Sequence, residues 1–281
     1  MNIEKLKNTT ISISTDQKEE LQDVQNHIDH RGITVQRVGI KDFKIPLKLQ
    51  EREGDSQIVT ASVTMGVELP KEFKGTHMSR FIEILNEWKP QNFVSIELKY
   101  LLMKTCDRLD ARGAYISLKF PYFIYKTAPK SKLKSLMDYN CEFEASIYNN
   151  YYQFILGLEV PITTVCPCSR EISDFGAHNQ RGIIRVKIRY DSAEVIWIEN
   201  LVSSLESIGS SPVYSLLKRE DEKFVTEKAY NNPKFVEDIL RDTVLLLKQD
   251  SRINWFEVEC ENAESIHNHA AYAYYNSGFE K

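Results

Sequence analysis

Long stretches of alternating apolar residues are the feature that most limits the folds open to this chain. In residues 57–69 and 152–162, every second side chain is apolar. This alternation is typical of strands that bury one face, so the sequence predicts antiparallel sheet covered on one side. Further strands are predicted at residues 33–47, 114–125, 141–149, 183–190 and 253–260.

Helical periodicity interrupts the strands at matching places in the two halves. Helices are predicted at 75–90, stopped by Pro90, and at about 92–110, 194–208 and 233–248, the last starting at Pro233. Each half therefore reads strand, strand, two helices, strand. This order predicts an α+β fold of two tandem modules, 1–130 and 140–281, each with two helices on one face of an antiparallel sheet. The Lys- and Ser-rich segment 126–140 is predicted to be a linker.

The free sheet edges and the net charge each indicate which partners the chain can have. Open sheet edges can pair with other copies of the chain, so we expect an oligomer. The 36 Lys and Arg against 40 Asp and Glu give a net charge of −4, which argues against nucleic acid and anionic membranes as partners. A polyanionic ligand would need a local basic cluster. The N-terminus lacks a signal-peptide pattern, so a cytoplasmic protein is predicted.

The densest group of reactive side chains lies in residues 164–182. If this segment is extended, Cys166 and Cys168 point to the same side, about 7 Å apart, and a flexible loop can bring His178 back to a thiolate. Thiolate and imidazole suit Zn²⁺ or a similar divalent ion, and a third, carboxylate ligand would leave an open position for water, as in catalytic sites. Alternatively, the Cys-Pro-Cys sequence turns the chain and His178 caps a loop. The remaining cysteines, Cys106, Cys141 and Cys260, are predicted to be small core residues.

Two further segments carry candidate functional residues. Residues 218–238 alternate acidic and basic side chains and form either a solvated face or a source of carboxylates, with Glu222 or Glu227 on the metal and Glu237 in a pocket. His267 and His269 are two apart, so they are either metal ligands, proton-transfer or phosphate-binding groups, or ordinary surface residues. Phosphate-binding glycine motifs of the P-loop and dinucleotide types do not occur in the sequence.

Five strings are spread in order over nearly the whole chain: QNHIDHRGITVQRVGIKDF, GTHMSRF, CPCSREISDFGAHNQRG, KREDEKFVTEKAYNNPKFVED and SIHNHAAYA. Together they resemble the prokaryotic type IB GTP cyclohydrolase I family. The resemblance implies a tunnelling fold whose modules close into a barrel in a homotetramer, with active sites at subunit interfaces. It also implies conversion of GTP and water to formate and 7,8-dihydroneopterin triphosphate, which leads to tetrahydrofolate and, in some organisms, to a deazaguanine tRNA base.

The resemblance also assigns roles to residues by motif. Cys166, His178 and Glu222 are implied to hold one divalent metal (Zn²⁺, Mn²⁺ or Fe²⁺) per active site. Glu237 is implied to anchor the guanine, because one carboxylate can accept both N–H donors on its edge, a pair that adenine lacks. Implied catalytic residues are Cys168, His267 and His269, and further substrate-binding residues are Arg31, His77, Arg80 and Arg181.

Two other functions use part of the same residues. A nitrile reductase of the tunnelling fold would employ a nucleophilic cysteine and NADPH, but it gives His178 and Glu222 no task as metal ligands. A metal-stabilised binding module would need no catalysis. Metal content and turnover of GTP distinguish the three.

Overall fold

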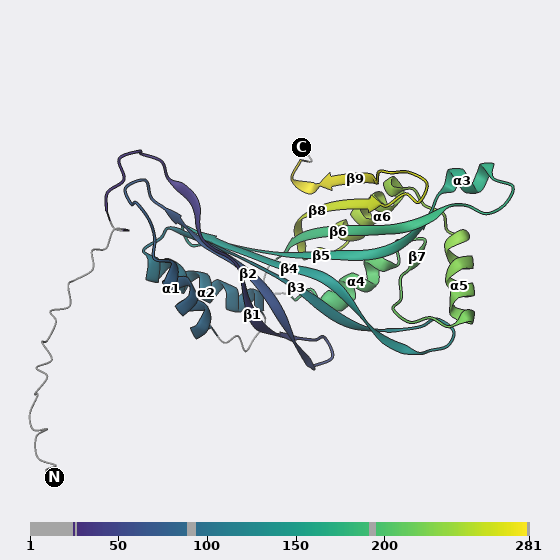
Figure 1. Ribbon diagram of the computed structural model, residues 1–281, viewed down its shortest axis with the longest axis horizontal. Coiled ribbons are helices and arrows are strands. Elements are labelled where there is room, and N and C mark those ends of the chain that lie inside the picture. The colour runs from purple at the N-terminus through teal and green to yellow at the C-terminus, as the bar shows by residue number, and fades with distance from the viewer. Residues whose placement is uncertain (1–24, 26, 89–93, 191–194, 280–281) are drawn as a thin grey trace, which may run out of the picture.

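The computed structural model describes residues 25, 27–88, 94–190 and 195–279. Within them, nine strands form one antiparallel sheet in the order β1-β2-β3-β4-β5-β6-β8-β9, and β7 pairs with β5 (Figure 1). The strands are β1 (Val35–Gln50), β2 (Ser56–Leu69), β3 (Gly113–Thr127), β4 (Lys134–Tyr148), β5 (Tyr151–Val165), β6 (Asn179–Tyr190), β7 (Ser211–Pro212), β8 (Ile253–Asn262) and β9 (Ala271–Asn276). The helices are α1 (Met78–Glu87), α2 (Val94–Leu109), α3 (Pro167–Ile172), α4 (Ile198–Glu206), α5 (Arg219–Tyr230) and α6 (Val236–Lys248), followed by the short 3₁₀ helix η2 (Ser277–Phe279).

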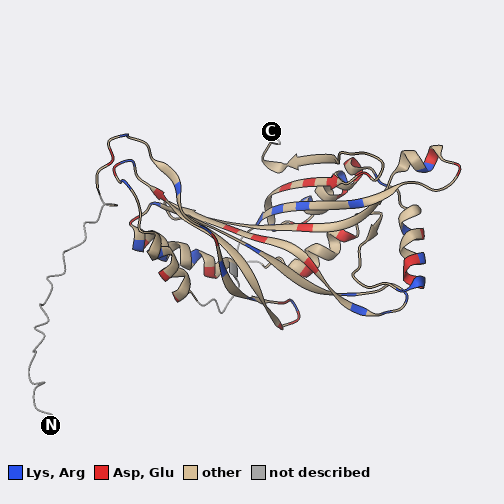
Figure 2. Cartoon of the chain, viewed as in Figure 1, with Lys and Arg blue, Asp and Glu red and all other residues tan. Residues whose placement is uncertain are grey.

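The apolar alternation seen in the sequence places one hydrophobic core on one face of this sheet. Alternate residues of β2, β3, β5, β6 and β8 are buried, and helices α1, α2, α4 and α6 contribute buried side chains to the same cluster. The intervening strand residues carry most of the charges seen along β5, β6 and β8 in Figure 2. The predicted α+β fold, with helices covering one face of an antiparallel sheet, is therefore confirmed.

The prediction that residues 126–140 form a linker is wrong, because most of these residues lie in strands β3 and β4. β3 and β4 pair continuously from Gly113 opposite Tyr148 to Thr127 opposite Lys134, and residues 128–133 alone make the turn. Met137, Tyr139 and Cys141 are buried in alternation, so the polar residues between them simply occupy the outer face. The two halves consequently share one sheet, and their division into modules 1–130 and 140–281 stays a prediction.

A buried ion pair also joins the two halves. Lys126 of β3 donates a hydrogen bond to Glu206 of α4 at 2.6 Å, and the hydroxyl of Tyr139 donates to the same carboxylate oxygen at 2.7 Å. Burial lowers the pKa of Lys126, and the attraction of Glu206 opposes that decrease. Both charged side chains are only 10% exposed, so each supplies the counter-charge of the other inside the protein.

Three local predictions need correction. Helix α6 begins at Val236, and Pro233 precedes it, because Lys234 instead donates its backbone N–H to Val165. Helix α5 was not predicted, since only Asp221 and Ala229 of its residues are buried and its apolar periodicity is weak. Strand β9 was also missed. Pro90, the predicted helix stop, lies outside the described residues.

The strands are long enough to separate the two ends of the molecule. β5 has 15 residues and spans about 50 Å. Helices α1 and α2 lie near the end where β5 begins, whereas α3 and α5 lie at the end where it finishes (Figure 1). Among the described residues, no helix has the length and apolar character needed to cross a membrane.

Candidate functional site

The end of the β5–β6 ladder brings Cys166 and His178 opposite each other. Val165 pairs with Asn179, and one step further the backbone N–H of Cys166 donates to the carbonyl of His178 at 3.1 Å. Directly opposed residues of antiparallel strands have Cβ atoms about 5 Å apart. Both residues continue the alternation that puts Thr164 and Gln180 on the buried face, and both are partly buried. The thiol and the imidazole therefore share one face at one end of the sheet.

Ser169 ties the thiol segment to the histidine. Its backbone N–H donates to Cys166 Sγ at 3.4 Å, and its hydroxyl accepts the backbone N–H of His178 at 3.1 Å. Cys166 is thus the N-cap of α3, and Pro167 occupies the first helical position, which its fixed φ favours. The predicted extended Cys-Pro-Cys geometry is wrong, because Cys168 lies within this helix and is exposed.

Hydrogen bonds also fix which nitrogen of His178 carries the proton. Gln180 donates its amide N–H to Glu264 at 3.3 Å, because a carboxylate can only accept, so the Gln180 carbonyl oxygen faces His178. That oxygen lies 3.0 Å from His178 Nδ1 and can only accept a hydrogen bond, which places the proton on Nδ1. In the neutral ring the lone pair is then on Nε2. Metal-binding histidines are held by partners in this manner.

The segments that carry Glu237 and the two C-terminal histidines reach the same end of the sheet. Lys234 donates its backbone N–H to Val165 at 3.0 Å, which anchors the start of α6, and Glu237 is exposed in the first turn of that helix. His267 and His269 follow Glu264 in the loop between β8 and β9, where both are exposed and their rings stack with centroids 5.1 Å apart. Glu264 itself contacts His178, so this loop borders the Cys166–His178 pair.

Glu222 is not brought to this pair within one chain. It lies in the first turn of α5, whereas Tyr230, at the other end of α5, packs beneath the Arg170 guanidinium of α3 at 4.7 Å. Eight residues of helix separate Glu222 from Tyr230, a rise of about 12 Å. Across the described ranges, no three His, Cys, Asp or Glu side chains are close enough to hold a metal.

The basic residues expected to bind substrate lie elsewhere. His77 and Arg80 belong to the start of α1, at the opposite end of the sheet (Figure 1), and Arg80 donates to the carbonyl of Arg108 at 3.2 Å. Arg31 lies near them in the chain fold, because the neighbouring Asp29 donates its backbone N–H to Glu72, in the segment between β2 and α1. Arg31 is exposed and pairs with Asp29, and its hydrogen bonds lower the pKa of Asp29 to about 2.

Arg181 lies near the candidate site in the sequence but on the other face of the sheet. It follows buried Gln180 along β6, and it lines a hollow of about 380 Å³ together with Tyr139 and Tyr214. Successive strand residues point to opposite faces, so Arg181 points away from the face that carries His178. One chain therefore does not gather the four predicted basic residues around the thiol and imidazole.

The other three cysteines are not comparable candidates. Cys141 and Cys260 are buried, as predicted, and Cys106 is half-buried against the core. Burial raises the pKa of Cys260 to about 12 and also raises that of Cys106 and Cys141. Protonated thiols are poor ligands and nucleophiles near neutral pH.

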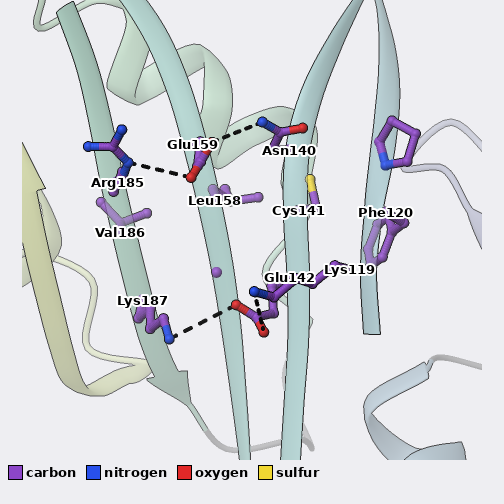
Figure 3. Close-up of a pocket in the computed structure, with 12 residues that line it drawn as sticks. Lys119, Phe120, Asn140, Cys141, Glu142, Leu158, Glu159, Arg185, Val186 and Lys187 are labelled. Atoms are coloured by element: carbon purple, nitrogen blue, oxygen red, sulfur yellow. Dashed lines mark hydrogen bonds and ion pairs between the residues drawn. The ribbon is translucent and has the colours of Figure 1, made fainter. Parts of the chain in front are cut away.

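A separate hollow of about 430 Å³ lies on the uncovered face of the sheet, centred on β4, β5 and β6 (Figure 3). Its charged groups pair with one another: Arg185 lies 3.4 Å from Glu159, and Lys187 lies 4.0 Å from Glu142. None of the predicted site residues lines it. We therefore place the candidate site at the Cys166–His178 end.

The matches to known proteins show the family of the chain. A family model for type I GTP cyclohydrolase folE2 matches residues 21–273. The chain belongs to this family. It is 51% identical to the GTP cyclohydrolase FolE2 of Geotalea uraniireducens (strain Rf4), over 90% of this chain and 92% of that one. It is 50% identical to the GTP cyclohydrolase FolE2 of Geobacter sp. (strain M21), over 91% and 94%.

The structural relatives of this FolE2-family chain confirm its fold class. A hyper-thermostable AgUricase mutant superposes with a TM-score of 0.54 at 8% identity, covering 88% of this chain and 94% of that one. The shared architecture is the tunnelling fold that the resemblance implied. At such low identity the likeness supports the fold alone.

Sequence reasoning missed three polar residues of the site. Ser169, Gln180 and Glu264 stand within or beside the motif strings, yet none was assigned a role. Gln180 was detectable, because it lies two positions after His178 in a strand and so must share its face. Glu264 could not be found this way, since its contact joins positions 84 residues apart.

Proposed function

We propose that this chain is a GTP cyclohydrolase I that converts GTP and water to formate and 7,8-dihydroneopterin triphosphate. Its place in the FolE2 family supports the reaction. The observation that carries the proposal is the pairing of Cys166 with a His178 whose Nδ1 is held by Gln180. The same family membership favours this hydrolase over the tunnelling-fold nitrile reductase.

The donor set fits a divalent metal. A cysteine sulfur and an imidazole Nε2 with its lone pair are ligands that Zn²⁺, Mn²⁺ and Fe²⁺ accept, and Nδ1 already has the kind of partner that metal-binding histidines have. We assign Cys166, His178 and Glu222 as the ligands, with Glu222 brought into place by assembly of the subunits. When bound, such a metal lowers the pKa of water so that water can attack the purine ring near neutral pH.

The remaining site residues bind the substrate and transfer protons. Glu237 accepts hydrogen bonds from N1–H and the exocyclic amine of guanine, which selects GTP over ATP. Cys168, exposed in the first turn of α3, and the stacked His267 and His269 move protons as the imidazole ring opens and formate leaves. These roles come from the family resemblance and from the location of the residues at one end of the sheet.

We further propose a homotetramer with active sites between subunits. Arg31, His77 and Arg80 lie about the length of β5 away from Cys166 in the same chain, so they can serve the site only from a neighbouring copy. Sheet edges β1 and β9 are the edges available for closing a barrel. The cytoplasmic location stays a prediction from the sequence.

The test is incubation of the metal-loaded protein with GTP, following formate and the fluorescent pterin formed on oxidation. We expect turnover with Mn²⁺ or Zn²⁺, and loss of turnover when a chelator removes the metal. ATP serves as the control substrate and should release no formate. Folded, metal-loaded protein that leaves GTP unchanged would overturn the proposal.

A further inference from the structure

A lysine-rich turn is fixed to the start of helix α5. The turn between β3 and β4 includes Lys130 and Lys132, and no acidic residue occurs between positions 126 and 137. Lys218 and Arg219 begin the helix that the turn contacts. The first turn of α5 also contains Glu220, Asp221 and Glu222, whereas the charged residues of the β3–β4 turn are all cationic. In a chain that is acidic as a whole, this turn is a local exception that can attract an anion.

Asp221 holds the turn in place. Its Oδ1 accepts the backbone N–H groups of Lys130 and Ser131 at 2.7 and 3.0 Å, and its Oδ2 accepts the Ser131 hydroxyl at 2.6 Å and the Lys218 N–H at 2.9 Å. Asp221 is fully buried. Burial alone would raise the pKa of Asp221, but these hydrogen bonds outweigh it and hold the pKa well below its ordinary value.

The side chains of the turn are ordered as well. The Lys130 ammonium lies 4.6 Å from the ring centroid of Phe224 on α5. Lys132 has a left-handed backbone, with φ of 60°, and its ammonium donates to the carbonyl of Pro129 at 2.8 Å. An ammonium has three N–H donors, so this single bond leaves Lys132 able to donate to a further acceptor.

We propose that Lys130, Lys132, Lys218 and Arg219 form a polyphosphate-binding arm that holds the triphosphate of GTP. The proposal rests on the function proposed above and deepens it. Asp221 directly precedes Glu222, so the arm is fixed relative to the proposed metal ligand whichever subunit supplies that ligand to the site. When assembly of the subunits brings Glu222 to the metal, it therefore also brings these cations close to the bound GTP. The negative charge of its triphosphate must be neutralised there.

The experiment uses the metal-loaded wild-type protein and the double variant Lys130→Ala/Lys132→Ala, with Lys99→Ala as matched control. Lys99 is an exposed lysine on α2, outside the arm. In the double variant, KM for GTP should rise at least tenfold while kcat and metal content stay within about twofold of wild type. Inorganic tripolyphosphate, which lacks guanine, should inhibit wild type and Lys99→Ala but inhibit the double variant at least tenfold less.

A direct binding measurement separates this proposal from the proposed function. Suppose that wild type releases no formate but binds GTP and tripolyphosphate, and that the double variant binds both at least tenfold more weakly. This result would support the polyphosphate-binding arm and contradict the proposed cyclohydrolase activity. Equal binding of GTP and tripolyphosphate by wild type and double variant overturns the arm, whatever the activity. Asp221→Asn, which loosens the turn and keeps every lysine, should raise KM in the same direction.

Discussion

Replacing Gln180 by leucine is the sharpest test of how the site holds its metal. Leucine is close to glutamine in size, so it fills the buried position on β6 but cannot accept the hydrogen bond that His178 Nδ1–H donates. The substitution also breaks the bridge to Glu264. The imidazole then loses the partner that fixes its tautomer and orientation, while Cys166 and the backbone ladder of β5 and β6 keep their bonds.

The expected loss can be estimated from the role of that partner. Removing a hydrogen-bond partner of a metal-bound histidine typically weakens metal binding about 10- to 100-fold. This corresponds to about 1.4–2.8 kcal/mol of binding free energy. His178 Nδ1 lies 3.6 Å from Glu264 Oε2, so the carboxylate can partly replace the lost amide, and we expect a value near the lower limit.

The assay is titration of the apoprotein with Mn²⁺ or Zn²⁺, combined with ¹⁵N NMR of the histidine rings. Wild type should show His178 protonated at Nδ1, whereas Gln180→Leu should show a mixture of tautomers and a weaker metal affinity. Gln153→Leu, at a half-buried position of β5 away from the site, is the control. Unchanged affinity in folded Gln180→Leu, or an Nε2-protonated ring in wild type, would refute the reasoning.

Four further outcomes test other parts of the molecule. Cys166→Ala should lose metal and activity, whereas Cys168→Ala should lose activity and keep the metal, as measured by metal analysis and formate release. Glu237→Ala should weaken GTP binding at least tenfold in a calorimetric titration, because a guanine edge with two donors loses its acceptor. Glu206→Gln should lower the free energy of unfolding in urea by about 3–5 kcal/mol, because it leaves a buried ammonium without its counter-charge. Asp221 has a lowered folded-state pKa, so its contribution to stability should be complete above about pH 4 and decline in more acidic solution, and Asp221→Asn should lack this decline.

Most of the sheet could be predicted from the sequence, because buried apolar residues alternate with exposed ones along each strand. Val59, Ala61 and Val63 alternate with polar residues in the sequence and are buried in the structure. The lysines and serines of residues 126–140 conceal the same period in β4, because their composition is typical of a linker even though Met137 and Tyr139 alternate with polar residues. Periodicity within a strand is local information, so it survives without knowledge of the partner strand.

Helix α5 is an element that local sequence patterns do not predict. Its sequence REDEKFVTEKAY has little apolar periodicity, and the acceptor that orders its start, Asp221, bonds to a turn about 90 residues earlier. An isolated helix of 12 residues is marginal, so contacts distant in sequence decide whether this one forms. The sequence signalled the charges of the segment but not the groups that they bind.

In the candidate site, too, contacts between residues near in sequence could be predicted, and contacts between distant residues could not. Cys166 and His178 are 12 positions apart and could be paired by a short loop, and the structure places them opposite each other. Glu222 and Arg80 come from other elements, and order along a chain gives no measure of their distance from Cys166. Because β5 keeps the two ends about 50 Å apart in one chain, a site that needs both ends requires a second copy. Sedimentation of active protein as a monomer would therefore exclude Arg80 from the site, even if Cys166, His178 and the metal were all as proposed.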